Sequence, residues 1–198
     1  MCCRYLLEES PELRPIVEAM NRSPLAGKLF PAGSLRAAGE VRPADAAPVL
    51  ARSRQGQPLV FPMKWGFTGK GLVFNARSET AADKPMFRDS WAARRCAVPA
   101  SCYFEWEHRP GPEGKKTGKY RLQADSAITW LCGLYRMEEG VPCFVVLTRE
   151  AGDGIRFIHD RMPLILPEDA ARKWLLPDSD PGELLSLART DLLFRPAV

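Results

Sequence analysis

Short apolar runs, each bounded by glycine, proline or polar residues, dominate the chain between residues 48 and 166. Several are rich in β-branched and aromatic residues, which is typical of strands. The 18 prolines also favour many turns and short elements over long helices. The runs predicted to form strands are Pro48–Ala51, Pro58–Lys64, Leu72–Asn75, Arg95–Val98, Ser101–Trp106, Tyr120–Gln123, Ile128–Tyr135, Cys143–Thr148 and Met162–Leu166.

Helical periodicity is found near both ends of the chain. Apolar residues from Leu13 to Met20 fall at helical spacing, and Ser10 and Pro11 precede them as a cap and a first-turn residue. Further helices or helical turns are predicted over Ser78–Asp83, Glu150–Ile158, Pro167–Leu175 and Gly182–Ala188.

Two segments are predicted to be irregular. Asn21–Pro31 reads as a polar link, and Arg109–Lys119 as a flexible, basic loop at the tip of a hairpin. With strands in the middle and helices at the margins, the pattern predicts an α+β fold, a strand-rich single domain over residues 1–198.

Composition narrows the class of protein without identifying it. The chain is 45% hydrophobic and 26% charged, as in an ordinary globular protein, and it has no apolar run of membrane-spanning length. No charged start is followed by an apolar stretch, so we expect no signal peptide and a cytoplasmic location. The net charge of +4 permits a polyanionic partner without requiring one.

The six cysteines are expected to be free thiols in a reducing compartment. No two of them have the C-x-x-C spacing of a metal site, and His108 and His159 are the only histidines. No metal or organic cofactor is therefore indicated.

Cys2 is the residue with the most distinctive potential chemistry. Removal of Met1 would leave a free α-amine and a thiol on adjacent carbons, with ordinary pKa values of about 8 and about 8.5. The amine can attack an aldehyde to give a Schiff base, and the thiol can close on the imine carbon to give a thiazolidine ring. The alternative is that Cys2 is a small buried hydrophobe, as free cysteine often is.

Four short motifs follow this start in a fixed order. They are Trp65-Gly66-Phe67, the stretch from Asn75 to Thr80, Tyr103-Phe104-Glu105-Trp106, and His159-Asp160-Arg161-Met162-Pro163. Together with Cys2 they resemble the SRAP family, the SOS-response-associated peptidases or abasic-site processing proteins. The resemblance runs from Cys2 to Leu166.

The resemblance implies a function, a fold and a set of catalytic residues. Cys2 would attack the ring-opened aldehyde of an abasic site in single-stranded DNA and form a stable thiazolidine crosslink that shields the lesion. Asn75 would hold the terminal cysteine, and Glu105 and His159 match the family's glutamate and histidine. The fold would consist of curved, barrel-like antiparallel sheets with peripheral helices.

Each of these three roles has a physical rationale and an alternative. Glu105, between two aromatic residues, is a candidate acid for the carbinolamine oxygen, or else a solvent-facing strand residue. His159 could shuttle protons and steady a 3′-phosphate, or belong to a surface ion-pair cluster. Asn75 could orient an amine, or form a turn at a strand end.

DNA contacts are expected from residues of the same motifs. Guanidinium groups would pair with phosphates, aromatic rings would stack on bases, and the Thr148 hydroxyl would donate to a phosphate. The alternative for the tryptophans is core packing, which we expect for Trp91, Trp130 and Trp174. The other predicted DNA contacts are Arg4, Trp65, Phe67, Arg77, Trp106 and Arg161.

The sequence departs from the family pattern in two places. Cys3 stands where the family usually has glycine, so a second thiol needs space beside the first. The segment Gly39-Glu40-Val41-Arg42-Pro43 replaces the family's frequent Asn-x-Ala-Pro, and a DNA contact there is not assured.

Two other functions compete with abasic-site crosslinking. One is an amidase or peptidase whose N-terminal cysteine attacks amides, and the family's peptidase description points the same way. The other is a noncatalytic binder of single-stranded nucleic acid. For an abasic-site crosslinking protein we expect a monomer with a weak lyase activity. Its partner would be single-stranded DNA with abasic sites or strand junctions, and it would associate with the nucleoid when DNA is bound.

Overall fold

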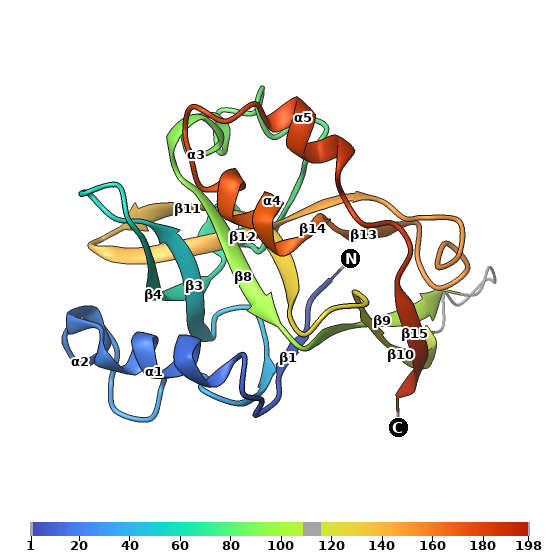
Figure 1. The fold of residues 1–198 in the computed structure, drawn as a ribbon, viewed down its shortest axis with the longest axis horizontal. Coiled ribbons are helices and arrows are strands. Elements are labelled where there is room, and N and C mark those ends of the chain that lie inside the picture. The colour runs from blue at the N-terminus through green and yellow to red at the C-terminus, as the bar shows by residue number, and fades with distance from the viewer. Residues whose placement is uncertain (1, 109–115, 198) are drawn as a thin grey trace.

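The computed structural model describes residues 2–108 and 116–197, and most of its strands belong to two sheets (Figure 1). Five strands of the larger sheet close into a barrel, because each pairs with two others of the set. β12 pairs in parallel with β4, and the pairs β4–β3, β3–β8, β8–β11 and β11–β12 are antiparallel. The barrel strands are β3 (Ala46–Arg52), β4 (Pro58–Trp65), β8 (Arg95–Ala100), β11 (Thr129–Glu138) and β12 (Val141–Glu150).

Short strands extend the barrel beside β12 and β11. β7 (Asn75–Arg77) pairs in parallel and β13 (Arg161–Pro163) antiparallel with the same end of β12, so that both Arg77 and Pro163 lie opposite Thr148. β14 (Ile165–Leu166) pairs with β11, and β5 (Phe67–Thr68) forms a separate hairpin with β6 (Leu72–Val73). Two motifs far apart in the sequence therefore meet on β12.

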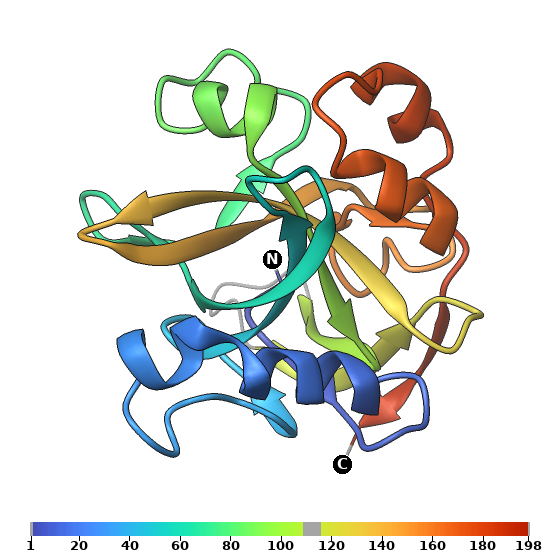
Figure 2. The same ribbon diagram turned by 60° about the vertical axis from the view of Figure 1, so that its left-hand side comes forward.

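The second sheet has the strand order β15-β10-β9-β1-β2. Tyr5 lies opposite both Val41 and Tyr103, and the N-terminal end of β1 points to the middle of the molecule (Figures 1 and 2). Alternation along the strands buries Tyr5, Tyr103 and Glu105 on the inner face toward the barrel. The strands are β1 (Tyr5–Leu7), β2 (Gly39–Val41), β9 (Cys102–His108), β10 (Lys116–Gln123) and β15 (Leu193–Ala197).

Five helices lie at the margins of the sheets in the described residues. α1 (Arg14–Arg22) and α2 (Pro24–Leu29) pack on β3 and β4, on the opposite side of the molecule from the others (Figure 2). α3 (Arg88–Ala93) and α4 (Glu168–Trp174) pack on β8 and β11, and α5 (Pro181–Ser186) packs on α4.

One contiguous hydrophobic cluster runs from Cys2 to Leu192 and joins the barrel to the second sheet. Trp130 and Trp174 are buried in it as predicted, and Trp91 packs edge-on against Trp174 at its margin, with ring centroids 5.4 Å apart. This single core confirms the prediction of a strand-rich α+β fold with peripheral helices.

Two predicted strands change partners midway. The backbone N–H of Val146 and the indole N–H of Trp65 both bond to the carbonyl of Phe74, so the run Leu72–Asn75 splits into β6 and β7 there. The run Met162–Leu166 splits at Leu164, which bonds to both β12 and β11.

The prediction of an irregular link over Asn21–Pro31 is wrong. α2 begins there at Pro24, and the Ser23 hydroxyl accepts the N–H of Leu25 as its cap. The short helix predicted over Ser78–Asp83 is also wrong, and the helical turn predicted over Glu150–Ile158 is present only in its later part, where Ile155 and Ile158 bond to carbonyls three residues back. Residues 78–83 form turns, and β12 continues to Glu150 before the turns at residues 153–158.

The basic loop lies partly outside the described residues, which exclude 109–115. The strands on either side of it, β9 and β10, pair antiparallel. Within the described residues no helix combines the length and apolarity needed to cross a bilayer.

Candidate active site around the N-terminal cysteine

Cys2 lies just before β1 and is fully buried between the two sheets. Its backbone carbonyl accepts a 2.7 Å hydrogen bond from the side-chain amide of Asn75, and its thiol donates to the carbonyl of Arg4 at 3.7 Å. Burial raises the pKa of the Cys2 thiol far above its ordinary value, and the nearby charge of Glu105 raises it further. In the chain that still carries Met1, this thiol is protonated and shielded.

Asn75 is the first residue of β7, where the parallel pairing with β12 sets it opposite Val146. Its amide nitrogen is used by Cys2, while its Oδ1 is buried and accepts no hydrogen bond within the described part of the chain. An unpaired buried acceptor costs roughly 1–3 kcal/mol. The side chain thus does more than form a turn at a strand end, because it holds the main chain of Cys2 and leaves one acceptor atom, Oδ1, unused.

Glu105 projects from the inner face of β9 and is only 3% exposed. One carboxylate oxygen accepts the backbone N–H of Trp106 at 3.3 Å. The charge of Glu105 raises the pKa of both the Cys2 thiol and the Tyr103 hydroxyl, after burial as the larger cause, so it lies close to both groups. A solvent-facing Glu105 is therefore excluded.

Three aromatic side chains pack together near Cys2. The ring of Tyr5 lies 5.3 Å from that of Trp65, which stacks on Phe144 at 6.0 Å. The Tyr5 hydroxyl is buried without a partner among residues 2–108 and 116–197, and burial and the neighbouring Cys2 raise its pKa.

Two predicted base contacts belong to this packing instead. Trp65 and Phe67 are both fully buried, and the indole N–H of Trp65 donates to the carbonyl of Phe74 at 2.8 Å. Gly66 between them has a φ of +123°, a conformation that glycine tolerates best. Neither ring has a face exposed to a base, so the prediction that they stack on DNA is wrong for this conformation.

Arg161 is held in place by ion pairing. Its guanidinium forms a bidentate pair with Glu79, at 2.7 and 2.8 Å, and donates to the carbonyl of Thr148 at 2.8 Å. Thr148 is fully buried, and its hydroxyl donates to the carbonyl of Ala76 at 3.4 Å. The expected phosphate contacts of Arg161 and Thr148 do not fit this arrangement, because both side chains serve the protein itself.

His159 is joined to Arg161 through the backbone. Its Nδ1 accepts the N–H of Arg161 at 3.0 Å and lies 2.6 Å from a carboxylate oxygen of Asp160. The first contact requires an unprotonated Nδ1 and the second a protonated one, so the two contacts favour different proton states. Asp160 gives His159 the ion-pair partner of the alternative interpretation when the ring is protonated.

The His159 turn and Glu105 are linked across β10. Phe157 contacts the ring of Tyr120 at 5.8 Å, and Tyr120 lies opposite Glu105 in the β9–β10 pairing. β12 connects the same turn to Asn75 through β7 and β13. The fold therefore gathers the motifs of Cys2, Asn75, Glu105 and His159 into one region.

Arg77 and Trp106 fit the predicted nucleic-acid interface best. Arg77 is exposed and lines a hollow of about 600 Å³ together with Asn75 and Thr148. Trp106 is partly exposed, and the guanidinium of Arg4 lies 5.2 Å from the centre of its ring.

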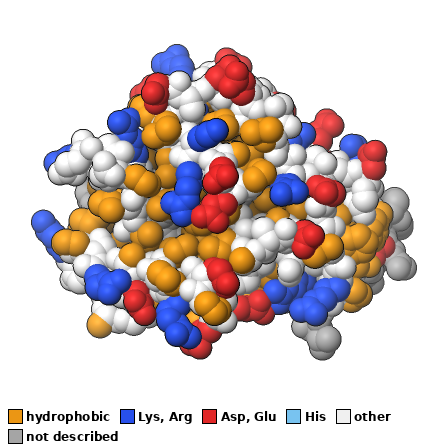
Figure 3. Space-filling view, viewed as in Figure 1, with side chains coloured by type: hydrophobic (Ala, Val, Ile, Leu, Met, Phe, Trp, Pro, Cys, Tyr) orange, Lys and Arg blue, Asp and Glu red, His pale blue; other side chains and the backbone are white. Residues whose placement is uncertain are grey.

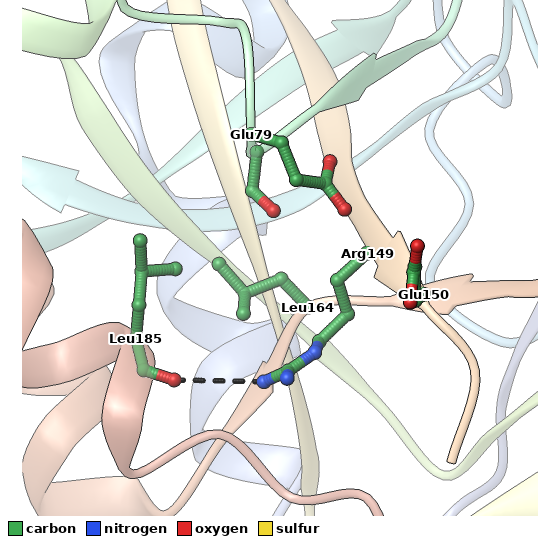
Figure 4. A pocket seen from close by; sticks show the side chains of 6 residues that line it. Glu79, Arg149, Glu150, Leu164 and Leu185 are labelled. Atoms are coloured by element: carbon green, nitrogen blue, oxygen red, sulfur yellow. Dashed lines mark hydrogen bonds between the residues drawn. The ribbon is translucent and has the colours of Figure 1, made fainter. Parts of the chain in front are cut away.

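A second hollow lies along β12 (Figure 4). Arg149 reaches across it and donates to the carbonyl of Leu185 at 3.5 Å, while Glu79 and Glu150 add two carboxylates to the lining. None of the candidate catalytic residues lines this hollow, and its acidic groups do not suit DNA.

All six cysteines lie in the described residues and are free. Cys3 is partly exposed, so the structure accommodates a side chain where the family usually has glycine. No group of three or more histidine, cysteine or acidic side chains within residues 2–108 and 116–197 is arranged to hold a metal ion.

Comparison with known proteins decides the family. Residues 1–193 match the family described as SOS response associated peptidase (SRAP). The chain belongs to the SRAP family. Among its relatives is the abasic site processing protein YoqW of Bacillus subtilis, 28% identical over 94% of this chain and 86% of YoqW. The abasic site processing protein YedK of Escherichia coli is 31% identical over 76% of this chain and 70% of YedK.

Solved structures share the SRAP fold of this chain. A phage-related protein of Bordetella bronchiseptica has a TM-score of 0.74 at 23% identity over 99% of this chain and 94% of that protein. A protein of Bacteroides thetaiotaomicron has a TM-score of 0.73 at 20% identity over 98% and 91% of the two chains. At these identities the likeness establishes the fold.

Sequence reasoning missed two residues of this SRAP site. Tyr5 comes three residues after Cys2, but only its burial and the pairing of β1 with β9 show that it lies on the inner face, where Cys2 influences its pKa. Glu40 was noted only as a departure, whereas the structure places it against Arg4 and Lys119. Its contacts span 36 and 79 residues of sequence, so no local pattern could have indicated them.

Proposed function

We propose that this protein, once Met1 is removed, forms a covalent thiazolidine link between Cys2 and the aldehyde of an abasic site in single-stranded DNA. The link would shield the lesion until repair. Several curated relatives are named abasic site processing proteins, which supports DNA with lost bases as the substrate class.

The observation that carries the proposal is the contact between Asn75 and Cys2. The hydrogen bond goes to the carbonyl of Cys2, so it fixes the terminal residue without using its amine or its thiol. The buried Oδ1 of Asn75 is an unused acceptor close by, and a free α-amine is a donor that suits it. A residue that merely ended a strand would require neither feature.

The reaction needs no cofactor or redox partner. The α-amine adds to the aldehyde carbon, and the resulting carbinolamine loses water to give an imine. The sulfur then bonds to the imine carbon while the thiol proton is transferred to the nitrogen. One water is released for each ring that forms.

Glu105 would act on the oxygen that leaves. A carboxyl group beside the aldehyde can protonate the carbinolamine hydroxyl, and can also assist opening of the closed sugar. Its burial next to Cys2 keeps bulk water away from the reacting atoms. His159, linked to the same region through Arg161, would exchange protons on the phosphate side.

The buried thiol suits the second step better than the first. Its raised pKa keeps it protonated, so the amine would react before the sulfur. Removal of Met1 would be required to generate that amine, and the aldehyde would have to enter between the two sheets.

The same chemistry allows minor activities. An imine acidifies the neighbouring carbon and promotes β-elimination, which would give weak strand cleavage before the ring closes. The family is described as a peptidase, and removal of the residue before Cys2 is one cleavage consistent with that description.

The proposal is tested with the purified protein and single-stranded DNA that carries one abasic site. We expect a heat-stable shifted band on a denaturing gel, a mass equal to protein plus DNA minus one water, and attachment at Cys2. Cys2→Ala should give no adduct, whereas Cys3→Ala, its matched neighbour, should react normally. An adduct on Cys3, or an equal adduct on DNA without the lesion, would refute the proposal.

A further inference from the structure

Three cations surround one carboxylate on the outer face of the five-stranded sheet. Glu40 accepts from Arg4 at 3.3 Å, from Arg42 at 3.1 Å and from Lys119 at 2.9 Å. These residues belong to or directly flank β1, β2 and β10, so they come from three separate parts of the chain. Two positive charges remain unbalanced within the cluster.

Two of the three cations are fixed in position by aromatic rings. The ammonium of Lys119 lies 4.0 Å from the centre of the Phe104 ring, and Arg4 lies 5.2 Å from that of Trp106. Cations over aromatic faces are stabilised where they sit. Neither group is deeply buried, with 22% of the Lys119 side chain and 31% of the Arg4 side chain exposed.

The ion pair of Glu8 with Arg121 provides an internal contrast on the same sheet. One carboxylate binds one guanidinium through two parallel hydrogen bonds, at 2.7 and 2.6 Å. Arginine and carboxylate match in charge and geometry there. The Glu40 cluster has one carboxylate for three cations, which is a pattern suited to a more highly charged anion.

A DNA phosphate has the properties that such a cluster would bind. It is negatively charged and offers several acceptor oxygens, whereas Glu40 offers two. The hydrogen bond from Lys119 holds the pKa of Glu40 below its ordinary value, so Glu40 is ionised at neutral pH. Blue side chains gather at the lower right of the molecule, over the region of β10 and β15 (Figure 3). The carbonyl of Arg4 accepts the thiol of Cys2 at 3.7 Å, so the backbone of this residue joins the cluster on the outer face to the candidate active site.

We propose that Arg4, Arg42 and Lys119 form a phosphate-binding subsite for the DNA strand, and that Glu40 occupies it until a backbone phosphate takes its place. That the bound strand carries an abasic site rests on the function proposed above, whereas binding of its backbone phosphate does not. Glu40 lowers the affinity of the free protein for DNA and keeps the three cations gathered.

The test measures noncovalent binding to lesion-free single-stranded DNA. All proteins carry Cys2→Ala, so that no crosslink forms, and affinity is measured across a range of salt concentrations. We expect Glu40→Gln to bind about three- to tenfold more tightly at low salt, because an occupant that repels phosphate is lost. The slope of log K against log salt should steepen by up to about 0.7, the value for one more phosphate on a single strand.

Glu168→Gln is the matched control. Glu168 pairs with Arg172 on α4, so this substitution makes the same change in net charge and also releases one arginine. Arg42→Gln and Lys119→Gln should each weaken binding and flatten the salt dependence. Thermal unfolding of every variant checks that the fold is retained.

The possible results separate this proposal from the crosslinking function. Equal effects of Glu40→Gln and Glu168→Gln would overturn the subsite, since net charge alone would explain them. Unchanged binding by Arg42→Gln and Lys119→Gln would overturn it as well. If the Glu40 effect appears but the protein with intact Cys2 forms no adduct, the subsite stands and the crosslinking proposal fails.

Discussion

The two faces of the five-stranded sheet contrast sharply. The inner face carries Tyr5, Tyr103 and Glu105, all at most 3% exposed and packed around Cys2. The outer face carries Glu40 and its three cations, all of them partly or well exposed. One sheet supplies both sets, because successive side chains along its strands point to opposite faces.

Two glutamates show what the contrast means for function. Glu105 lies among aromatic residues beside a thiol, where a proton can be transferred out of contact with water. Glu40 lies among cations, and the hydrogen bond from Lys119 keeps its carboxylate ionised at neutral pH. Under the two proposals above, the inner face carries out covalent chemistry and the outer face holds a charged polymer, so substitutions on the two faces should affect different measurements.

Among changes at the inner face, blocking the α-amine of Cys2 should reduce crosslinking the most. A residue placed before Cys2 that cannot be trimmed leaves the thiol and every outer-face charge intact. We expect no adduct, as with Cys2→Ala, because the imine cannot form. The same extension with a protease site should regain full activity after cleavage. Normal crosslinking by the uncleaved protein would show that the amine has no role.

Glu105→Gln should slow crosslinking by about 10²–10⁴-fold, the usual contribution of a general acid or base. Binding to lesion-free DNA should remain within twofold of the parent protein, about 0.4 kcal/mol. Glu107→Gln, two residues along the same strand, is the matched control. Single-turnover adduct formation measures the effect, and equal slowing by both variants would contradict a special role for Glu105.

The tryptophans separate stability from binding. Trp65→Ala should lower the free energy of unfolding by about 3–5 kcal/mol, since it leaves a cavity beside Tyr5 and Phe144. Trp106→Ala should cost less stability but weaken single-stranded DNA binding by about 1–3 kcal/mol, the usual range for base stacking. Denaturant titration and equilibrium binding distinguish them, and the reverse pattern would restore Trp65 as a DNA contact.

Asn75→Ala should slow crosslinking about two- to tenfold through loss of one hydrogen bond worth about 0.5–1.5 kcal/mol. Asn75→Asp keeps the acceptor oxygens but loses the donor, so it separates the two proposed uses of the amide. Rates of adduct formation, measured near a saturating DNA concentration, compare the two variants with the parent protein. A rate unchanged in both variants would remove Asn75 from the mechanism.

Acidification should have the smallest effect of these changes. It should lower stability by protonating carboxylates that are paired with cations. Hydrogen bonds from Lys119 and Arg161 hold the pKa values of Glu40 and Glu79 below the ordinary 4.5. Their contribution to stability is therefore complete above about pH 4.5 and is lost as the pH falls through the lowered values. Denaturant titrations should show a shallower acid decline for Glu79→Gln. An identical decline would show that this pair adds nothing.

Local sequence patterns predicted the barrel strands well. The run Cys143–Thr148 is apolar up to Leu147 because it is buried on both sides, and that signal does not depend on distant partners. Short edge strands were missed, since β2 has three residues and β15 is largely exposed. α2 was missed although Ser23 and Pro24 repeat the cap signal of Ser10 and Pro11.

The candidate site was predicted in its residues but not in its geometry. Cys2, Asn75 and Glu105 were nominated on motif resemblance, and the structure brings them together. Trp65 stacks on Phe144, and Arg161 pairs with Glu79. These neighbours determine the role of each side chain. Such partners are far apart in sequence, so residue type alone could not separate stacking from packing or a free cation from a paired one.

The amide of Asn75 grips the main chain of residue 2, and every amino acid has the same main chain at that point. The anchorage is therefore indifferent to the side chain it presents. The same hydrogen bond could hold a serine or an alanine in that position, so under the proposed function cysteine is required for ring closure and not for fit. The structure thus offers a buried anchor for residue 2 that does not depend on side-chain type, and in the proposed reaction the sulfur makes an otherwise reversible imine lasting.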